Sequence, residues 1–145
     1  MQDVNLKPAT PADEAFVDER TRSTMGPHVE ATWPDEAGRE HYYSLNRFHL
    51  PTTSIIYCAG ERAGRLTVTR AEHEIILDDI HLLSQFQGRG IGTNLIVGLI
   101  EEGRRSGKDV SLMALKVNPA KVLYERLGFQ VYKESEERFY MRMKV

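Results

Sequence analysis

The sequence of 145 residues lacks several features that would assign it to particular protein classes. Its one cysteine, Cys58, excludes an internal disulfide and has no metal-ligand spacing around it. The 19 Lys and Arg do not exceed the 21 Asp and Glu, so the basic excess of a general nucleic-acid or membrane-surface binder is missing. No apolar run approaches membrane-spanning length, and the first ten residues lack a signal-peptide core. We therefore expect a cytoplasmic protein with no nucleic-acid, membrane or metal partner.

The composition is that of an ordinary globular protein. Hydrophobic residues make up 41% and charged residues 28% of the chain, which is enough apolar material for one sizeable core. No internal repeat, low-complexity tract or linker divides the sequence. We expect a single domain, residues 1–145.

Hydrophobic periodicity and turn residues predict a mixed α/β (α+β) sheet with helices against it. Capping residues, prolines and early acids favour two helices within 10–24 and 33–48, with residues 23–43 spanning the turn between them. Two further helices are expected after the glycines near residue 90 and within 118–128. The expected strands are 4–7, 54–60, 62–70, 73–83, 109–117, 129–135 and 137–145.

Three alternating glycines, Gly88, Gly90 and Gly92, stand at the start of an amphipathic helix whose apolar stripe includes Ile91 and Leu95. The first amides of a helix have no partner within it and carry the positive end of the helix dipole. Glycines there let a bulky anion approach the backbone, so the turn predicts a phosphate site. Neither the phosphate-loop NTPase motif nor the dinucleotide-binding glycine spacing fits, and a tight turn without ligand is the alternative.

The spacing that fits is [Q/R]-x-x-G-x-[G/A], from Gln87 to Gly92, and here the chain resembles the GNAT superfamily of acyl-CoA-dependent N-acyltransferases. A second segment, "LKVNPAKVLYERLGF", resembles the other signature of that family, one strand further on. The resemblance implies a twisted, mostly antiparallel sheet of about seven strands with four helices, split between the fourth and fifth strands. It implies transfer of an acetyl or short acyl group from acetyl-CoA to a primary amine by direct attack.

The resemblance also implies a role for particular residues toward CoA. The loop and first helical turn would hold the pyrophosphate. The backbone of the preceding strand end would pair with the pantetheine arm, as an added strand does. Asn118 would reach the pantetheine or fix the loop beside it, although capping of its helix explains it equally. The residues expected at the pyrophosphate are Gln87, Gly88, Arg89, Gly90, Ile91, Gly92 and Thr93, and those at the pantetheine are Leu82 and Leu83.

Tyr124 matches the general acid of many family members, which protonates the departing thiolate; packing against the sheet is its alternative role. For the base, the fifth-strand position that holds Glu in some members is Met113 here. On the fourth strand, Asp78 is expected to share a face with Ile80, and Asp79 with His81. We expect Asp78 to be the base and His81 to be packed or hydrogen-bonded.

The acceptor is expected over residues 23–43, where aromatic and acidic side chains would suit a cationic amine. The candidates are His28, Glu30, Trp33 and Tyr42, although helix entry and dipole pairing explain these residue types as well. The identity of the small-molecule or peptide acceptor and a homodimeric state stay open. The alternatives to an enzyme are a non-catalytic acyl-CoA-binding or sensing domain and an interaction module with a structural CoA site.

Overall fold

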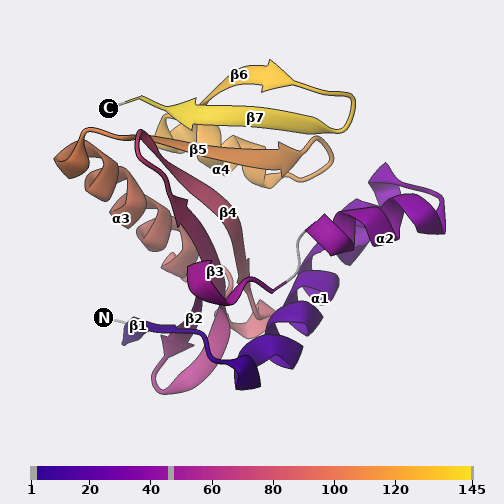
Figure 1. The fold of residues 1–145 in the computed structure, drawn as a ribbon, viewed down its shortest axis with the longest axis horizontal. Helices are drawn as coiled ribbons and strands as arrows, with labels where there is room; N and C mark the ends of the chain where they lie inside the picture. Colours follow the sequence, from indigo (N-terminus) through magenta and orange to yellow (C-terminus); the bar gives the residue numbers. More distant parts are fainter. Residues whose placement is uncertain (1–2, 46–47, 145) are drawn as a thin grey trace. The chain divides into compact units, whose positions relative to one another are not determined.

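The computed structural model describes residues 3–45 and 48–144 and contains one seven-stranded sheet in the order β1-β2-β3-β4-β5-β7-β6 (Figure 1). Two compact units make up the chain, Met1–Thr67 with Asp79–Gly92, and Val68–Asp78 with Thr93–Val145. Strands β3 (Glu61–Arg70) and β4 (Glu74–Leu82) contribute residues to both units. The predicted fold class, a mixed and mostly antiparallel sheet with four helices, is confirmed.

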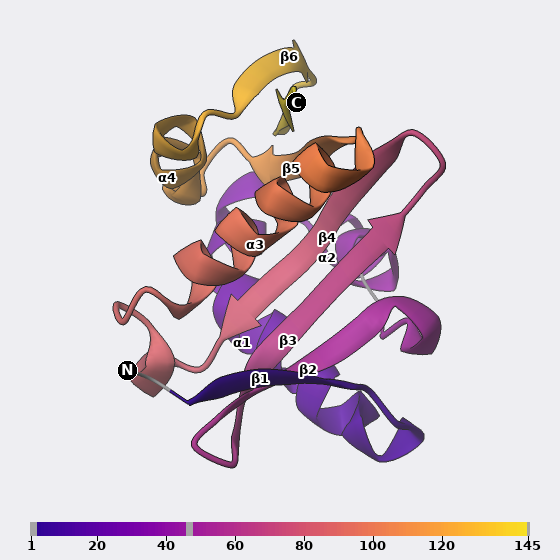
Figure 2. The ribbon, with the colours of Figure 1, turned by 90° about the vertical axis from the view of Figure 1, so that its left-hand side faces the viewer.

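The first unit holds β1 (Val4–Pro8), β2 (Thr53–Cys58) and most of β3, which lie side by side in Figure 2. Both pairs are antiparallel, and the hairpin between β2 and β3 turns at Ala59 and Gly60. These two residues have φ angles of 51° and 82°, the left-handed conformation of a tight hairpin turn. The sequence predicts this turn at Gly60 and Glu61, so the turn begins one residue earlier than predicted.

Two helices complete this unit, α1 (Glu14–Thr32) and α2 (Glu36–Leu45). The expectation that the first helix ends by residue 24 is wrong, because α1 continues through Gly26 and Pro27 and only residues 33–35 connect the helices. Four residues at helical spacing are buried along α1, and they extend past the proline: Val17, Thr21, Met25 and Val29. Burial of this stripe outweighs the backbone hydrogen bond that Pro27 cannot donate.

The second unit holds most of α3 (Ile91–Ser106), β5 (Asp109–Leu115), α4 (Ala120–Leu127), β6 (Gln130–Glu134) and β7 (Arg138–Met143). Strands β4 and β5 are parallel and pair from Glu74–Asp109 to Leu77–Leu112, although both continue beyond these pairs. Strand β7 lies between β5 and β6 and is antiparallel to both. Helix α4 ends at Gly128, whose φ of 106° is the left-handed cap that the sequence predicted.

Candidate active site

The glycine loop connects the 3₁₀ turn Ser84–Phe86 to α3. Gly88 and Gly90 have φ angles of 74° and 81°, which side chains other than glycine rarely adopt, and a Cβ atom at either would meet nothing within 4 Å. The glycines are therefore required by backbone conformation, and the space above them is open. The first turn of α3 has no acidic residue, while Arg104 and Arg105 lie in its last turn. The helix start thus keeps the positive dipole end that a phosphate group needs.

The end of β4 beside this loop presents a backbone edge. The Leu83 N–H donates to the Ala63 carbonyl of β3 at 2.8 Å, so the polar groups of Leu82 point to the other side of the strand. The Leu82 carbonyl accepts from the Gln87 side-chain amide at 2.9 Å. A carbonyl oxygen can accept a second hydrogen bond. This geometry fits the pantetheine arm expected at Leu82 and gives Gln87 a structural task that the motif alone does not reveal.

Arg89 is exposed on the loop, and its guanidinium lies 5.3 Å from the ring centroid of the buried Phe86. This ring contact holds the guanidinium against Phe86, which precedes the glycines of the loop. Thr93 follows in the first turn of α3 and is half-buried. The donor set of the loop is thus backbone amides with one guanidinium, which suits an anionic pyrophosphate.

Asn118 and Tyr124 belong to the second unit. The Asn118 Oδ1 accepts from the Ala120 N–H at 2.9 Å, so the capping role is present, and its side-chain NH₂ adds a donor for a ligand. Tyr124 is half-buried on α4, and its ring lies 6.1 Å from that of Phe129 in an edge-on arrangement. Packing therefore accounts for the ring of Tyr124, and the chemistry of its hydroxyl stays a prediction.

The two adjacent acids of β4 have different surroundings. Asp78 is exposed and accepts from the Thr69 hydroxyl at 2.6 Å. It shares its face of the strand with Ile80 and Leu82, whose δ-carbons lie 3.8 Å from the position of a Cβ at Gly92. Asp79 lies on the other face, and its side chain is only 10% exposed. The predicted division of the strand into two faces is confirmed.

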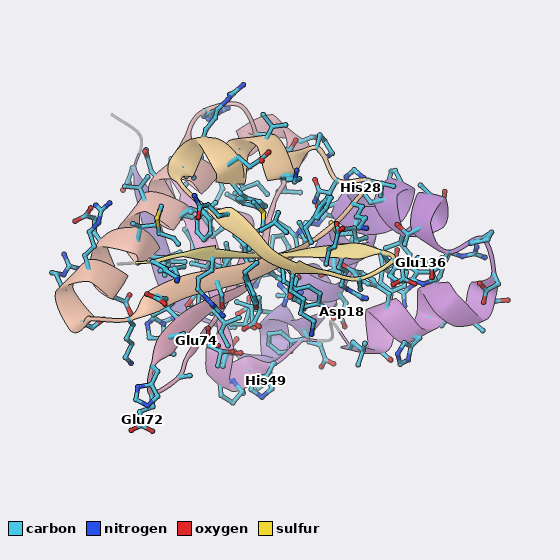
Figure 3. The ribbon with its side chains drawn as sticks, turned by 90° about the horizontal axis from the view of Figure 1, so that it is seen from above. Asp18, His28, His49, Glu72, Glu74 and Glu136 are labelled. Carbon is cyan, nitrogen blue, oxygen red and sulfur yellow. The ribbon has the colours of Figure 1, made fainter. Side chains whose placement is uncertain are left out.

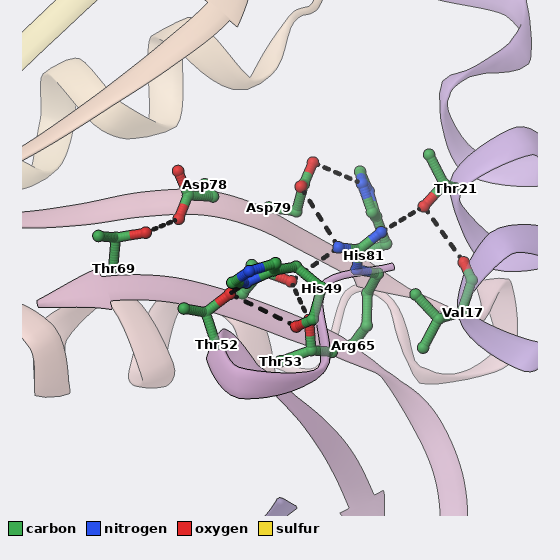
Figure 4. A network of polar contacts seen from close by, with 11 residues as sticks. Val17, Thr21, His49, Thr52, Thr53, Arg65, Thr69, Asp78, Asp79 and His81 are labelled. Carbon is green, nitrogen blue, oxygen red and sulfur yellow. Dashed lines mark hydrogen bonds and ion pairs between the residues drawn. The ribbon is translucent and has the colours of Figure 1, made fainter. Parts of the chain in front are cut away.

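Asp79 belongs to a buried polar network that the sequence analysis did not find (Figure 4). Its Oδ2 lies 3.4 Å from Nη2 of Arg65, and its Oδ1 lies 3.3 Å from Nε2 of His81. Arg65 is fully buried on β3 and donates to the hydroxyls of Thr21 and Thr67, both at 2.7 Å. The signal in the sequence was an arginine in the middle of a buried strand, where a charge requires partners.

The residues expected at the acceptor lie on or beside the helical hairpin. His28 is half-buried on α1 (Figure 3). Glu30 is exposed on the same helix. Trp33 packs against Gly38, where a Cβ would lie 2.8 Å from its ring, and its ring lies 5.5 Å from that of the buried Tyr42. Trp33 and Tyr42 thus hold the hairpin together, and any contact of these four with an acceptor stays a prediction.

A pocket of about 450 Å³ lies between the two helices of the first unit. Helix α1 and helix α2 supply both carboxylates and hydroxyls to its wall. The lining residues are Glu14, Asp18, Thr21, Arg22, Glu40, Tyr43, Ser44 and Phe48.

Only some of the carboxylates in this pocket have a cationic partner. The Arg22 guanidinium lies 3.6 Å from Glu40 and 4.2 Å from the centroid of the Tyr43 ring. Burial raises the pKa of the Tyr43 phenol; Arg22 acts against this rise, and the carboxylates of Glu30 and Glu40 add to it. The phenol therefore stays a hydrogen-bond donor over a wider pH range. The other pocket carboxylates form no ion pair with the described part of the chain, so the pocket suits a cation.

Residues 3–45 and 48–144 hold neither a candidate metal cluster nor a candidate membrane-spanning helix. They contain no group of three or more His, Cys, Asp and Glu side chains placed to hold a metal ion. No helix in the same residues is both long enough and apolar enough to cross a membrane.

Comparison with known proteins gives consistent relatives. A protein-family model described as an acetyltransferase (GNAT) domain matches residues 52–131. The mouse thialysine N-epsilon-acetyltransferase is 34% identical over 115 residues, which are 70% of this chain and 68% of that protein.

Solved structures share the fold over nearly the whole chain. The PaiA N-acetyltransferase of Thermoplasma acidophilum, in complex with coenzyme A, superposes with a TM-score of 0.75 at 15% identity over 99% of both chains. Arabidopsis thaliana Naa50, in complex with a bisubstrate analogue of CoA and a peptide, has a TM-score of 0.66 at 12% identity, covering 98% of this chain and 99% of that one. The chain belongs to the GNAT family and is an acyl-CoA-dependent acetyltransferase.

Proposed function

We propose that this acetyltransferase moves an acetyl, or another short acyl, group from acetyl-CoA to the primary amine of a small molecule or peptide by direct attack. The observation that carries the proposal is the open loop of left-handed glycines at the acid-free start of α3. It supplies an anion site of the kind that the CoA pyrophosphate requires. The exposed backbone edge of Leu82 lies beside it and suits the pantetheine arm.

The reaction needs two proton transfers. An ammonium acceptor gives one proton to a base, and its nitrogen then attacks the thioester carbonyl. The carbon–sulfur bond breaks, the electron pair leaves on sulfur, and an acid protonates the thiolate. We assign the acid to the Tyr124 phenol. Asp78, which is exposed and held by Thr69, is the carboxylate that the sequence assigns to the base, acting through water.

Two observations support a cationic amine as the acceptor. The name of the mouse relative specifies the N-epsilon amine of thialysine, a primary amine at the end of a side chain. The pocket between α1 and α2 offers Glu14 and Asp18 to a positive charge. His28, Glu30, Trp33 and Tyr42 are proposed as further acceptor contacts around the same hairpin. Because Naa50 binds a bisubstrate analogue that contains a peptide, peptide N-termini are also among the acceptors to be tested.

Release of free CoA, measured with a thiol reagent, tests the proposal directly. The purified protein is incubated with acetyl-CoA and a panel of primary alkylamines, basic amino acids and peptides. Steady, amine-dependent thiol release is expected for at least one acceptor class. Binding of CoA without turnover across the panel would instead favour the non-catalytic acyl-CoA-binding domain. A protein that binds no CoA would contradict the assignment of the loop.

A further inference from the structure

One side chain in the middle of the second unit's sheet is exposed where its neighbours are buried. Strand β5 is an interior strand, paired with β4 on one side and with β7 on the other. Met113 on this strand is 58% exposed, whereas Ser111 and Leu115, which share its face by the period of two residues, are 6% and 4% exposed. The exposure is therefore confined to one apolar and flexible side chain.

Met113 stands where β5 separates from β4. The two strands pair in parallel as far as Leu77–Leu112, and both continue beyond this pair. In the same register, the next positions are Asp78 on β4 and Met113 on β5. Both residues belong to the second unit, so their relation follows from a single strand pair. Met113 is thus the first residue of β5 past the point where the strands separate.

The edge of β4 that β5 leaves free has a defined end. The pantetheine arm is proposed to pair with this edge from Leu82, beside the glycine loop, as an added strand does. From Leu82 back to Asp78 the edge is about 13 Å long, at about 3.3 Å per residue, and an extended pantetheine arm can span this length. At Leu77 the same edge is already paired with β5, so an added strand cannot continue. We therefore expect the thioester end of the arm to stop beside Met113.

We propose that Met113 limits the length of the acyl chain that the protein transfers. The inference rests on the proposed function and narrows its donors to acetyl-CoA and its shortest homologues. A longer acyl chain has to pass the Met113 side chain, because β5 occupies the edge of β4 beyond it. Tyr140 lies directly opposite Met113 on β7 and is half-buried, with the Lys133 ammonium 5.1 Å from its ring centroid. The β7 side of Met113 is thus also filled, and its thioether is the flexible part of the boundary.

The test changes the size of this one side chain in both directions. Met113→Ala removes the thioether arm, and Met113→Phe adds bulk at the same position. Val131→Ala is the matched control, because Val131 is another apolar strand residue, 40% exposed on β6 at the edge of the sheet. Melting temperatures without ligand and with CoA are measured first. All three variants should stay folded, because the changed side chains are exposed, and should keep the CoA-induced shift, because CoA carries no acyl group.

Acyl donors are then compared with one acceptor, as the ratio of kcat/KM for butyryl-CoA to kcat/KM for acetyl-CoA. Met113→Ala is expected to raise this ratio at least about tenfold over the wild type, since room for one or two methylene groups changes discrimination by that order. Met113→Phe should lower the corresponding ratio for propionyl-CoA by a similar factor. Val131→Ala should leave both ratios unchanged. The thermal shift with each acyl-CoA, compared with the shift with CoA, should change in the same directions and needs no acceptor.

Several results would overturn the inference. Unchanged ratios in both Met113 variants, or an equal change in Val131→Ala, would remove the role of this side chain. A lower butyryl-CoA ratio in Met113→Ala would show that the thioether supports the acyl chain and does not limit it. A change in the KM of the acceptor alone would place Met113 at the acceptor instead.

Failure of the proposed function would look different. A wild-type protein that binds acyl-CoA but turns over no amine would reject the proposed transfer, while the thermal shifts would still decide whether Met113 limits the bound acyl chain. A wild-type protein with no thermal shift for CoA or any acyl-CoA would reject both.

Discussion

The glycine loop can be tested by a pair of substitutions whose structural cost is the same. Gly90 has a φ of 81° and Gly107, just after α3, has a φ of 69°, and a Cβ at either would meet nothing within 4 Å. Alanine in this left-handed conformation destabilises the folded state by roughly 1–2 kcal/mol. Alanine also restricts the unfolded chain more than glycine does, which offsets about 0.4–1 kcal/mol of this loss. Both Gly90→Ala and Gly107→Ala should therefore lower the melting temperature without ligand by only a few degrees, at about 2–4 °C per kcal/mol for a protein of this size.

Ligand binding should separate the two variants. CoA at about a hundred times its Kd stabilises the folded state by about 2.7 kcal/mol, which differential scanning fluorimetry resolves easily. Gly107→Ala should keep this shift, whereas Gly90→Ala should lose most of it, because the methyl group and the strained backbone disturb the amides that face the pyrophosphate. A Gly90→Ala protein with the full shift would refute the loop as the cofactor site. Loss of the shift in both variants would show that the effect is not local.

Three further expectations concern chemistry and stability. Tyr124→Phe should lower kcat roughly a hundredfold while the CoA-induced thermal shift stays unchanged, and equal kcat values would leave Tyr124 as a packing residue. Gly64→Ala should lower the unfolding free energy by at least about 1–3 kcal/mol in denaturant titration, because the new Cβ would lie 2.0 Å from the backbone oxygen of His81. The hydrogen bond from Arg70 holds the pKa of Glu102 below its ordinary value. Glu102→Gln should therefore lower the unfolding free energy by less than about 1 kcal/mol near neutral pH. The difference in unfolding free energy from the wild type should vanish as pH falls through that depressed pKa.

Local signals in the sequence predicted the elements that depend on local chemistry. The alternating glycines predicted the start of α3, and the structure adds that Gly88 and Gly90 have the positive φ that favours glycine. Gly128 was likewise identified as the end of α4. In these places the conformation of one residue decides the structure, and the residue type reports it directly.

Helix α1 shows where local signals fail. The Gly26–Pro27 pair is a typical helix breaker, so the sequence predicted an early end. The helix continues because Met25 and Val29 extend the buried stripe on both sides of the proline. The stripe stabilises the helix through tertiary burial, and turn residues in the sequence carry no information about that burial.

The buried network of Arg65, Asp79 and His81 could not be predicted from the sequence for a different reason. Arg65 meets Thr21 from 44 residues away and Asp79 from 14 residues away, and no short motif marks such pairs. The strand period did separate Asp78 from Asp79, but it could not show which face of β4 lies under α1.

The alternation of β4 gives the two faces of this strand different surroundings. Its Ile80 and Leu82 side chains contact the start of α3, where the glycine loop suits the cofactor, and the Leu82 carbonyl is the backbone edge proposed for the pantetheine. One residue out of phase, Asp79 and His81 lie on the face of Arg65, whose guanidinium donates to the Thr21 hydroxyl of α1. A period of two residues thus places the proposed pantetheine edge and the buried polar network on adjacent residues of one strand. A shift of one residue would exchange the two faces, and the close contact of Gly64 with the His81 carbonyl, which admits no side chain, helps to hold this register.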